Sequence, residues 1–140
     1  MLNWLARRDY SQHEIAQKLK AKAYSQEAIS LIITKLMQAN LINEYRFTEN
    51  YIRSRLAKGY GPLRISKELQ VRGILPDQIA EQLQITDNAW LINVRKVWQK
   101  HFKGKLPNDF KDRAKQIRFL LYRGFTEEQI ESVLKNDEPA

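Results

Sequence analysis

The chain has 140 residues, 43% hydrophobic and 29% charged, a balance typical of a folded domain and unlike a disordered segment. It has no cysteine, which excludes disulfides and thiolate metal sites, and no apolar run approaches the roughly 20 residues that a membrane-spanning helix needs. The net charge of +8 favours acidic or polyanionic partners. The N-terminus shows no export pattern, so we expect a cytoplasmic protein without a membrane partner.

Apolar residues recur at helical spacing along the whole chain, as in Ile15 with Leu19 and Ile65 with Leu69, whereas the alternation typical of strands is almost absent. The fold class is therefore expected to be all-α. In chain order the predicted helices are 1–9, 11–22, 25–39, 43–58, 61–72, 76–86, 88–102, 109–123 and 126–135.

Residue types that begin and end helices support these bounds. Ser11 with Glu14, and Thr126 with Gln129, have the spacing of capping boxes, in which each side chain binds the backbone of the other residue. Prolines suited to a first helical turn, and glycines suited to a left-handed helix end, are Pro62, Pro76, Gly73 and Gly124.

The helices repeat with a period near 50 residues. A shift of about 50 aligns apolar positions of the first unit with the second, and a shift of about 51 aligns the second with the third. Aligned sets include Ile15 with Ile65, Leu19 with Leu69 and Leu120, and Ile29 with Ile79 and Ile130. We expect three tandem three-helix repeats in an elongated, curved array, because each unit is too small to bury its own apolar faces. The expected units are 1–42, with a shortened first helix, 43–87 and 88–136, followed by an acidic tail, 137–140.

The segment Gly-Tyr-Gly-Pro at 59–62 stands directly before a basic amphipathic helix, where a phosphate-binding loop would also place glycines. Such a loop would need a preceding strand and a following Lys-Ser or Lys-Thr, and neither is present. The equivalent place in the first unit has Ser11 and no glycine pair. We interpret the segment as a joint between helices, in which Gly59 and Gly61 supply unusual backbone angles and Pro62 begins the next helix.

Three stretches together resemble the RecX family of recombination regulators: 41-LINEYRFTENYIRSR-55, 51-YIRSRLAKGYGPLRISKELQVRGI-74 and 116-QIRFLLYRGFTEEQI-130. The pattern K-G-Y-G-P-x-R-I-x-x-E-L-x-x-x-G-I is long and unusual, and the likeness covers essentially the whole chain. Asn43 stands where an Asp is common in that family. The resemblance implies three three-helix units that bind the groove of the RecA filament on single-stranded DNA and inhibit the recombinase, ATPase and coprotease activities of RecA, with a role in DNA repair and the SOS response.

Catalysis has little support in the residue pattern. The two histidines, His13 and His101, belong to different predicted helices, and no acidic cluster has metal-ligand spacing. We expect a protein that is not an enzyme, with no cofactor and no metal. Its expected partners are the RecA filament and single-stranded DNA, with double-stranded DNA as a further candidate, and a monomer is the default in the absence of a heptad pattern.

The basic residues are the candidates for binding, because few acidic residues lie among them. They are expected to face solvent on the second and third units and to contact DNA phosphates, an acidic groove of RecA, or both. The candidates are Arg53, Arg55, Lys58, Arg64, Lys67, Arg72, Arg95, Lys96, Lys100, Lys103, Lys105, Lys111, Arg113, Lys115, Arg118 and Arg123.

The aromatic residues divide into a predicted core set and two candidates for binding. Trp90, Trp98, Phe102 and Phe119 have core spacing, whereas Tyr60 and Tyr122, beside the joints, are candidates for stacking on an unpaired base.

Two other functions stay open at this point. The three-helix units also resemble helix-turn-helix modules, so a non-specific DNA-binding protein is the first alternative. A helical scaffold whose charge serves only solubility is the second. It predicts no salt-sensitive binding to any polyanion, whereas both DNA-related hypotheses predict such binding.

Overall fold

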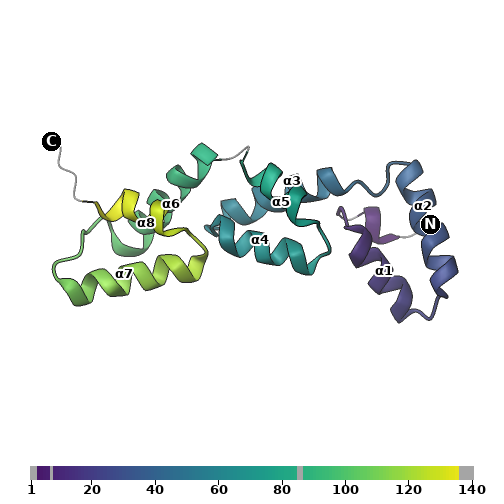
Figure 1. Cartoon of the computed structure of the whole chain (residues 1–140), viewed down its shortest axis with the longest axis horizontal. Helices are drawn as coiled ribbons and strands as arrows, with labels where there is room; N and C mark the ends of the chain where they lie inside the picture. The colour runs from purple at the N-terminus through teal and green to yellow at the C-terminus, as the bar shows by residue number, and fades with distance from the viewer. Residues whose placement is uncertain (1–2, 7, 85–86, 136–140) are drawn as a thin grey trace.

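The computed structural model describes residues 3–6, 8–84 and 87–135, and these form an elongated array of helices with the N-terminal part at one end and the C-terminal part at the other (Figure 1). The expected all-α class of tandem three-helix repeats is confirmed. The elements are the 3-10 helix η1 (Asn3–Ala6) and the α-helices α1 (Gln12–Ala21), α2 (Gln26–Gln38), α3 (Glu44–Ala57), α4 (Pro62–Val71), α5 (Pro76–Gln84), α6 (Asp87–Phe102), α7 (Phe110–Arg123) and α8 (Glu127–Leu134).

The first unit differs from the predicted one. An α-helix over 1–9 is wrong for the residues described there, which form only the 3-10 helix η1 and then a non-helical segment over 8–11. The repeat alignment already predicted a shortened first helix, and Trp4 and Leu5 of this short turn still pack against the core of the unit. The acidic tail expected at 137–140 lies outside the described residues.

Helix ends follow the sequence patterns closely. Both capping boxes form: Ser11 accepts a hydrogen bond from the backbone of Glu14, and Thr126 accepts one from the backbone of Gln129, with the reciprocal bonds also present. Pro62 and Pro76 occupy the first positions of α4 and α5. Glycines in left-handed conformation follow two of the helices, with φ of +86° at Gly73 and +101° at Gly124.

Each unit has its own buried cluster of apolar side chains, made by the positions that the repeat aligned. The members of the first cluster are Tyr10, Ile15, Leu19, Ile29 and Ile42. Those of the second are Phe47, Ile52, Ile65, Leu69, Ile74, Ile79 and Trp90. Those of the third are Val94, Trp98, Leu120, Phe125, Ile130, Val133 and Leu134.

Helix α6 contributes to two of these clusters. Trp90, at its start, is buried in the second cluster and donates a hydrogen bond to the carbonyl of Leu83, whereas Trp98 is buried in the third. The core role predicted for both tryptophans is confirmed. Because one helix fills two cores, the second and third units are held together by a rigid element as well as by a surface contact.

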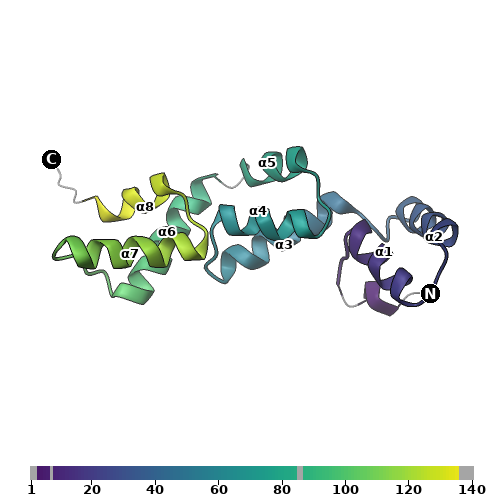
Figure 2. The same cartoon turned by 60° about the horizontal axis from the view of Figure 1, so that its bottom comes forward.

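The second helices of the three units, α1, α4 and α7, follow one another along the array (Figure 2). The carboxyl end of α4 meets the amino end of α1, where the Ser11 hydroxyl donates a 2.7 Å hydrogen bond to the carbonyl of Arg72. The carboxyl end of α7 meets the amino end of α4 in the same way, and there the Gly61 N–H donates a 2.8 Å bond to the carbonyl of Arg123. The unit-to-unit joint is therefore itself a repeated structure.

The second joint corrects the role expected for one glycine. Gly59 has a left-handed φ of +88°, as predicted, but Gly61 has an ordinary φ of −96°. A Cβ atom at Gly61 would lie 2.5 Å from the backbone carbonyl of Gly124. Gly61 is thus required by the close approach of two backbones and not by its own backbone angles, and the interpretation of 59–62 as a joint agrees with this contact.

Candidate functional site

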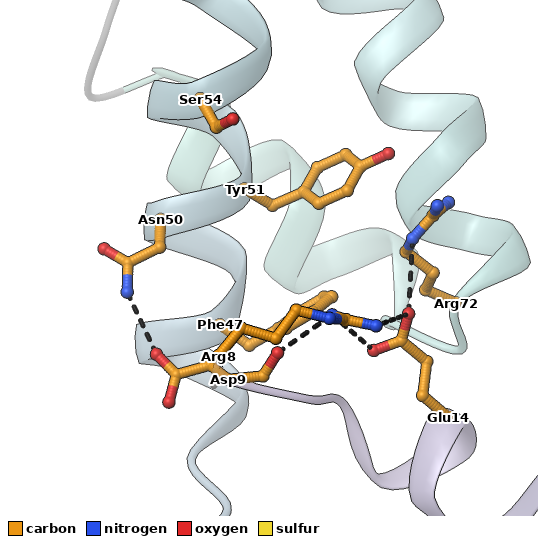
Figure 3. Close-up of a pocket in the computed structure, with 8 residues that line it drawn as sticks. All are labelled: Arg8, Asp9, Glu14, Phe47, Asn50, Tyr51, Ser54 and Arg72. Carbon is orange, nitrogen blue, oxygen red and sulfur yellow. Dashed lines mark hydrogen bonds and ion pairs between the residues drawn. The ribbon is translucent and has the colours of Figure 1, made fainter. Parts of the chain in front are cut away.

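A pocket of about 470 Å³ opens at the first joint, between the first and second units (Figure 3). Glu14, at the start of α1, lies at the centre of the pocket. Arg8 donates a hydrogen bond to one oxygen of the Glu14 carboxylate at 3.3 Å, and Arg72 lies 3.5 Å from the other. The Arg8 guanidinium also lies 3.7 Å from the centroid of the Tyr10 ring. Positive and negative side chains compensate each other here, as expected of a structural contact.

The opposite side of the same pocket is closed by Asp9. Its carboxylate accepts hydrogen bonds of 3.0 Å from both Arg46 and Asn50, two residues of α3. Figure 3 shows the bond from Asn50. Asn43 caps α3 through a 2.9 Å bond from the backbone of Arg46, so the Asn at this position retains a capping function. The charged side chains of this contact are therefore paired with one another within the protein.

Glu68 on α4 organises the interior face of the second unit. Its carboxylate binds Arg55 through two bonds of 2.9 Å and accepts a 2.8 Å bond from the Tyr51 hydroxyl. Burial alone would raise the pKa of Glu68, but the hydrogen bonds from Arg55 and Tyr51 lower it below its ordinary value. Burial, with the bond to Glu68, raises the pKa of Tyr51 to about 12.

Several arginines expected to face solvent are instead partly buried in these contacts. Arg55 pairs with Glu68, Arg72 with Glu14, and the side chain of Arg64 is 31% exposed beside Glu68. Arg123 is half-buried and donates to the carbonyl of Lys58. Their planar guanidinium groups suit paired and stacked contacts, and this explains why arginines occupy the joints.

Tyr60, a candidate for stacking on an unpaired base, lies among the same arginines. Its half-buried ring lies 4.2 Å from the guanidinium carbons of both Arg55 and Arg64, and 5.3 Å from that of Arg123. Cations already surround this ring, which favours a packing role for it, and stacking of Tyr60 on a base stays a prediction. Tyr122 is 75% exposed, and its candidacy stays a prediction.

Among the candidate cations of the described chain, one group is exposed and has no ion pair or side-chain hydrogen bond. Its members, called the free cations below, are Lys58, Lys67, Lys96, Lys100, Lys103, Lys105, Lys111, Lys115 and Arg118. The remaining candidates have partners: Arg53 pairs with Glu49, Arg95 donates to the carbonyl of Ser132, and Arg113 pairs with Glu131 at 2.7 Å. All but one of them are lysines, and in the described chain Lys20, Lys22, Lys35 and Lys135, outside the candidate set, are also exposed without such partners.

Two free cations occupy equivalent positions of the repeat. Lys67 on α4 and Arg118 on α7 are related by the same 51-residue shift that aligns Leu69 with Leu120. Because both leucines are fully buried and both cations are exposed, the two helices present a positive charge on corresponding outer faces. The first unit has Gln17 at this position, so the pattern begins with the second unit.

A second pocket, of about 430 Å³, opens between the second and third units. It is formed by the end of α3, the middle of α6 and the end of α7, and no carboxylate lines it within the described chain. Its lining residues are Ala57, Lys58, Gly59, Asn93, Lys96, Val97, Lys100, His101, Phe119 and Arg123. This pocket, called the second-joint pocket below, differs from the first in having only positive charge.

Side chains that sequence reasoning missed take part in this region. Asn93 is 6% exposed and donates a 3.3 Å bond to the carbonyl of Tyr60, joining α6 to the second unit. His101 stacks on Phe119 with ring centroids 3.8 Å apart and an interplanar angle of 12°. The sequence around His101 does not predict this pair, because Phe119 lies on another helix.

The described residues contain no group of three or more His, Asp or Glu side chains placed to hold a metal ion. His13 is exposed at the start of α1, against the Gly73 backbone, far along the chain from His101. Within the part of the chain that the structure describes, no helix is both long and apolar enough to cross a membrane.

Comparison with known proteins agrees with the repeats. Models of the first, second and third three-helix domains of RecX match residues 1–36, 43–83 and 93–134. A protein named Regulatory protein RecX from Legionella pneumophila is 39% identical to this chain, over 96% of this chain and 89% of its own length. Another of the same name, from Pseudomonas putida KT2440, is 38% identical, over 95% of this chain and 85% of its own length. The chain belongs to the RecX family.

Solved structures of the family confirm the fold. The crystal structure of RecX from Lactobacillus salivarius superposes with a TM-score of 0.80 at 23% identity, covering 96% of this chain and 89% of that one. Another, titled crystal structure of regulatory protein RecX, has a TM-score of 0.81 at 22% identity and covers 98% of this chain and 68% of that one. The curated RecX relatives are named as regulatory proteins.

Proposed function

We propose that this protein lies along the groove of the RecA filament on single-stranded DNA and inhibits the recombinase, ATPase and coprotease activities of RecA. Membership of the RecX family supports a regulatory role. The elongated array supports the mode of binding, because it can contact more than one filament subunit and the DNA between them at once.

The observation that carries the proposal is the set of free cations on the second and third units. These side chains have no internal partner in the described chain, so their charge is available to a polyanion or to an acidic protein groove. Lys67 and Arg118 show the arrangement best, since equivalent positions of two successive repeats both carry an exposed positive charge.

The mechanism that we propose is occupancy. The protein makes and breaks no bond and needs no cofactor; it fills the surface that strand exchange and the coprotease substrate require. We further propose that it acts as a cytoplasmic monomer, built of units 1–42, 43–87 and 88–136, with the joint contacts keeping the units in fixed relation.

The test is the DNA-dependent ATPase of RecA on single-stranded DNA, with this protein titrated in at sub-stoichiometric ratios to RecA. Inhibition at levels far below those that coat bare DNA is expected. The positively charged second-joint pocket also suits plain non-specific DNA binding, the alternative function. That alternative predicts inhibition only at concentrations that cover the DNA itself.

A further inference from the structure

We propose that the second-joint pocket is a nucleotide-binding site, in which one backbone phosphate of single-stranded DNA contacts Lys58, Lys96 and Lys100 while the adjoining base stacks on His101. The inference rests on the proposed function for its partner, single-stranded DNA. It goes further in locating one built site among the dispersed cations.

Charge is the first reason. Lys96 and Lys100 are four positions apart on α6, so they share one helix face, and Lys58 reaches the same pocket from the end of α3. All three side chains are exposed, and none has an ion pair or side-chain hydrogen bond among the described residues. A fourth cation, Arg123, also lines the pocket but is held by the carbonyl of Lys58.

The absence of compensating acid is the second reason. The pocket at the first joint is of similar size, yet Glu14 pairs with both arginines that line it, Arg8 and Arg72, and Asp9 adds a second carboxylate. Among the described residues, no Asp or Glu lines the second-joint pocket. An anionic ligand would therefore meet no carboxylate there, and its binding would relieve the repulsion among neighbouring ammonium groups.

The aromatic pair distinguishes a nucleotide from other anions. His101 is exposed, lines the pocket and lies flat on Phe119, which Phe102 contacts edge-on with ring centroids 5.3 Å apart. A flat ring supported from behind and placed beside ammonium groups is the arrangement that single-strand-binding proteins use for a base and its phosphate. An acidic peptide would use the ammonium groups but not the ring.

Dimensions and position agree with this assignment. The volume of about 430 Å³ falls within the range of about 300–1,000 Å³ usual for small-molecule sites. The lining residues come from α3 of the second unit and from α6 and α7 of the third. A bound nucleotide would consequently connect two units across their joint.

The test measures the affinity of the full-length protein for a fluorescent thymidine oligonucleotide across a range of salt concentrations. The double variant Lys96→Ala and Lys100→Ala is compared with Lys20→Ala and Lys35→Ala, which removes the same charge from exposed positions of the first unit, outside the pocket and the candidate set. We expect the pocket variant to lose at least about ten-fold in affinity and the control less than about three-fold. The slope of log K against log salt should become shallower by about 0.7 for each phosphate that the variant no longer neutralises.

Stacking is tested separately with an abasic oligonucleotide of the same length. His101→Ala should weaken binding of the thymidine oligonucleotide about five-fold or more but leave that of the abasic one unchanged, and His101→Phe, which keeps a flat ring, should retain binding. Thermal unfolding of each variant checks that the joint remains folded.

Three results would overturn the site. Equal losses for the two lysine pairs would mean that only diffuse charge binds DNA. Equal effects of His101→Ala on both oligonucleotides would exclude base stacking. Displacement of the oligonucleotide by polyglutamate at matched charge would indicate an acidic-peptide site. RecA inhibition measured on the same variants is a separate readout, so the pocket can fail while the regulatory function stands.

Discussion

The backbone N–H of Gly61 donates a 2.8 Å hydrogen bond to the carbonyl of Arg123, and this contact fixes the amino end of α4 against the carboxyl end of α7. A second bond, from the N–H of Leu63 to the carbonyl of Gly124, lies beside it at 2.9 Å. Helix ends leave such groups without intrahelical partners, so the joint satisfies the donors of one helix with the acceptors of another.

Gly61→Ala should open this joint. The added Cβ would lie 2.5 Å from the backbone of Gly124, which cannot move aside as a flexible side chain can. We expect a loss of about 3 kcal/mol in the free energy of unfolding, or separation of the two units. Urea unfolding measures the first outcome, and small-angle X-ray scattering detects the second as an increased radius of gyration.

Gly104→Ala is the matched control. Gly104 has a left-handed φ of +74° and open space around its Cβ position, so only backbone strain opposes the substitution, about 1 kcal/mol. Its scattering profile should equal that of the parent. A Gly61→Ala protein as stable as Gly104→Ala, with an unchanged profile, would show that close approach does not hold the joint.

Ser11→Ala should cost more than an ordinary helix cap. The buried Ser11 hydroxyl caps α1 and also donates to the carbonyl of Arg72 across the first joint. Thr126→Ala removes an equivalent capping box whose bonds in the described chain stay within one unit. We expect about 1 kcal/mol for Thr126→Ala and about 2–3 kcal/mol for Ser11→Ala by chemical denaturation. Equal values would mean that the inter-unit bond adds nothing.

Glu68→Gln should destabilise the second unit by about 1.5–3 kcal/mol, because the charge-assisted bonds to Arg55 depend on the carboxylate. The companion change Glu49→Gln removes the 3.8 Å pair with exposed Arg53 and should cost less than about 1 kcal/mol. Thermal and urea unfolding of the two variants measure the difference. Comparable losses would contradict a special role for Glu68.

The stability of the parent should depend on pH in a manner set by the same carboxylate. The folded pKa of Glu68 is below its unfolded value, so its contribution is complete above about pH 4.3 and is lost as the pH falls through the folded pKa. Tyr51 has its pKa raised to about 12, so its contribution is lost only as the pH rises from about 10 through that value. Urea unfolding between pH 3 and 7 should show the parent and Glu68→Gln converging at the acidic end. Parallel curves would refute the linkage.

The sequence alone predicts the repeated architecture. Period and capping chemistry are local properties, so Ile15, Ile65 and Ser11 indicated the cores and helix starts without any tertiary knowledge. The first helix was mispredicted because apolar content alone does not distinguish a short 3-10 turn from an α-helix.

Which cations are paired within the protein and which stay free was not predictable from the sequence in the same way. Arg64 and Lys67 lie on one amphipathic helix, and neither occupies one of its buried positions. Arg64 nevertheless contacts Glu68 and Tyr60, whereas Lys67 stays free. That difference depends on which unit stacks against α4, a long-range relation. The His101–Phe119 pair was missed for the same reason.

The most direct test of the regulatory account is RecA's single-stranded-DNA-dependent ATPase with the double variant Lys67→Glu and Arg118→Glu. Its control is Lys20→Glu with Lys35→Glu, which reverses two exposed lysines of the first unit, outside the repeated positions. The account predicts inhibition by the parent and by the control at sub-stoichiometric levels, and its loss in the Lys67 and Arg118 variant. Full inhibition by that variant, or none by the parent, would contradict it.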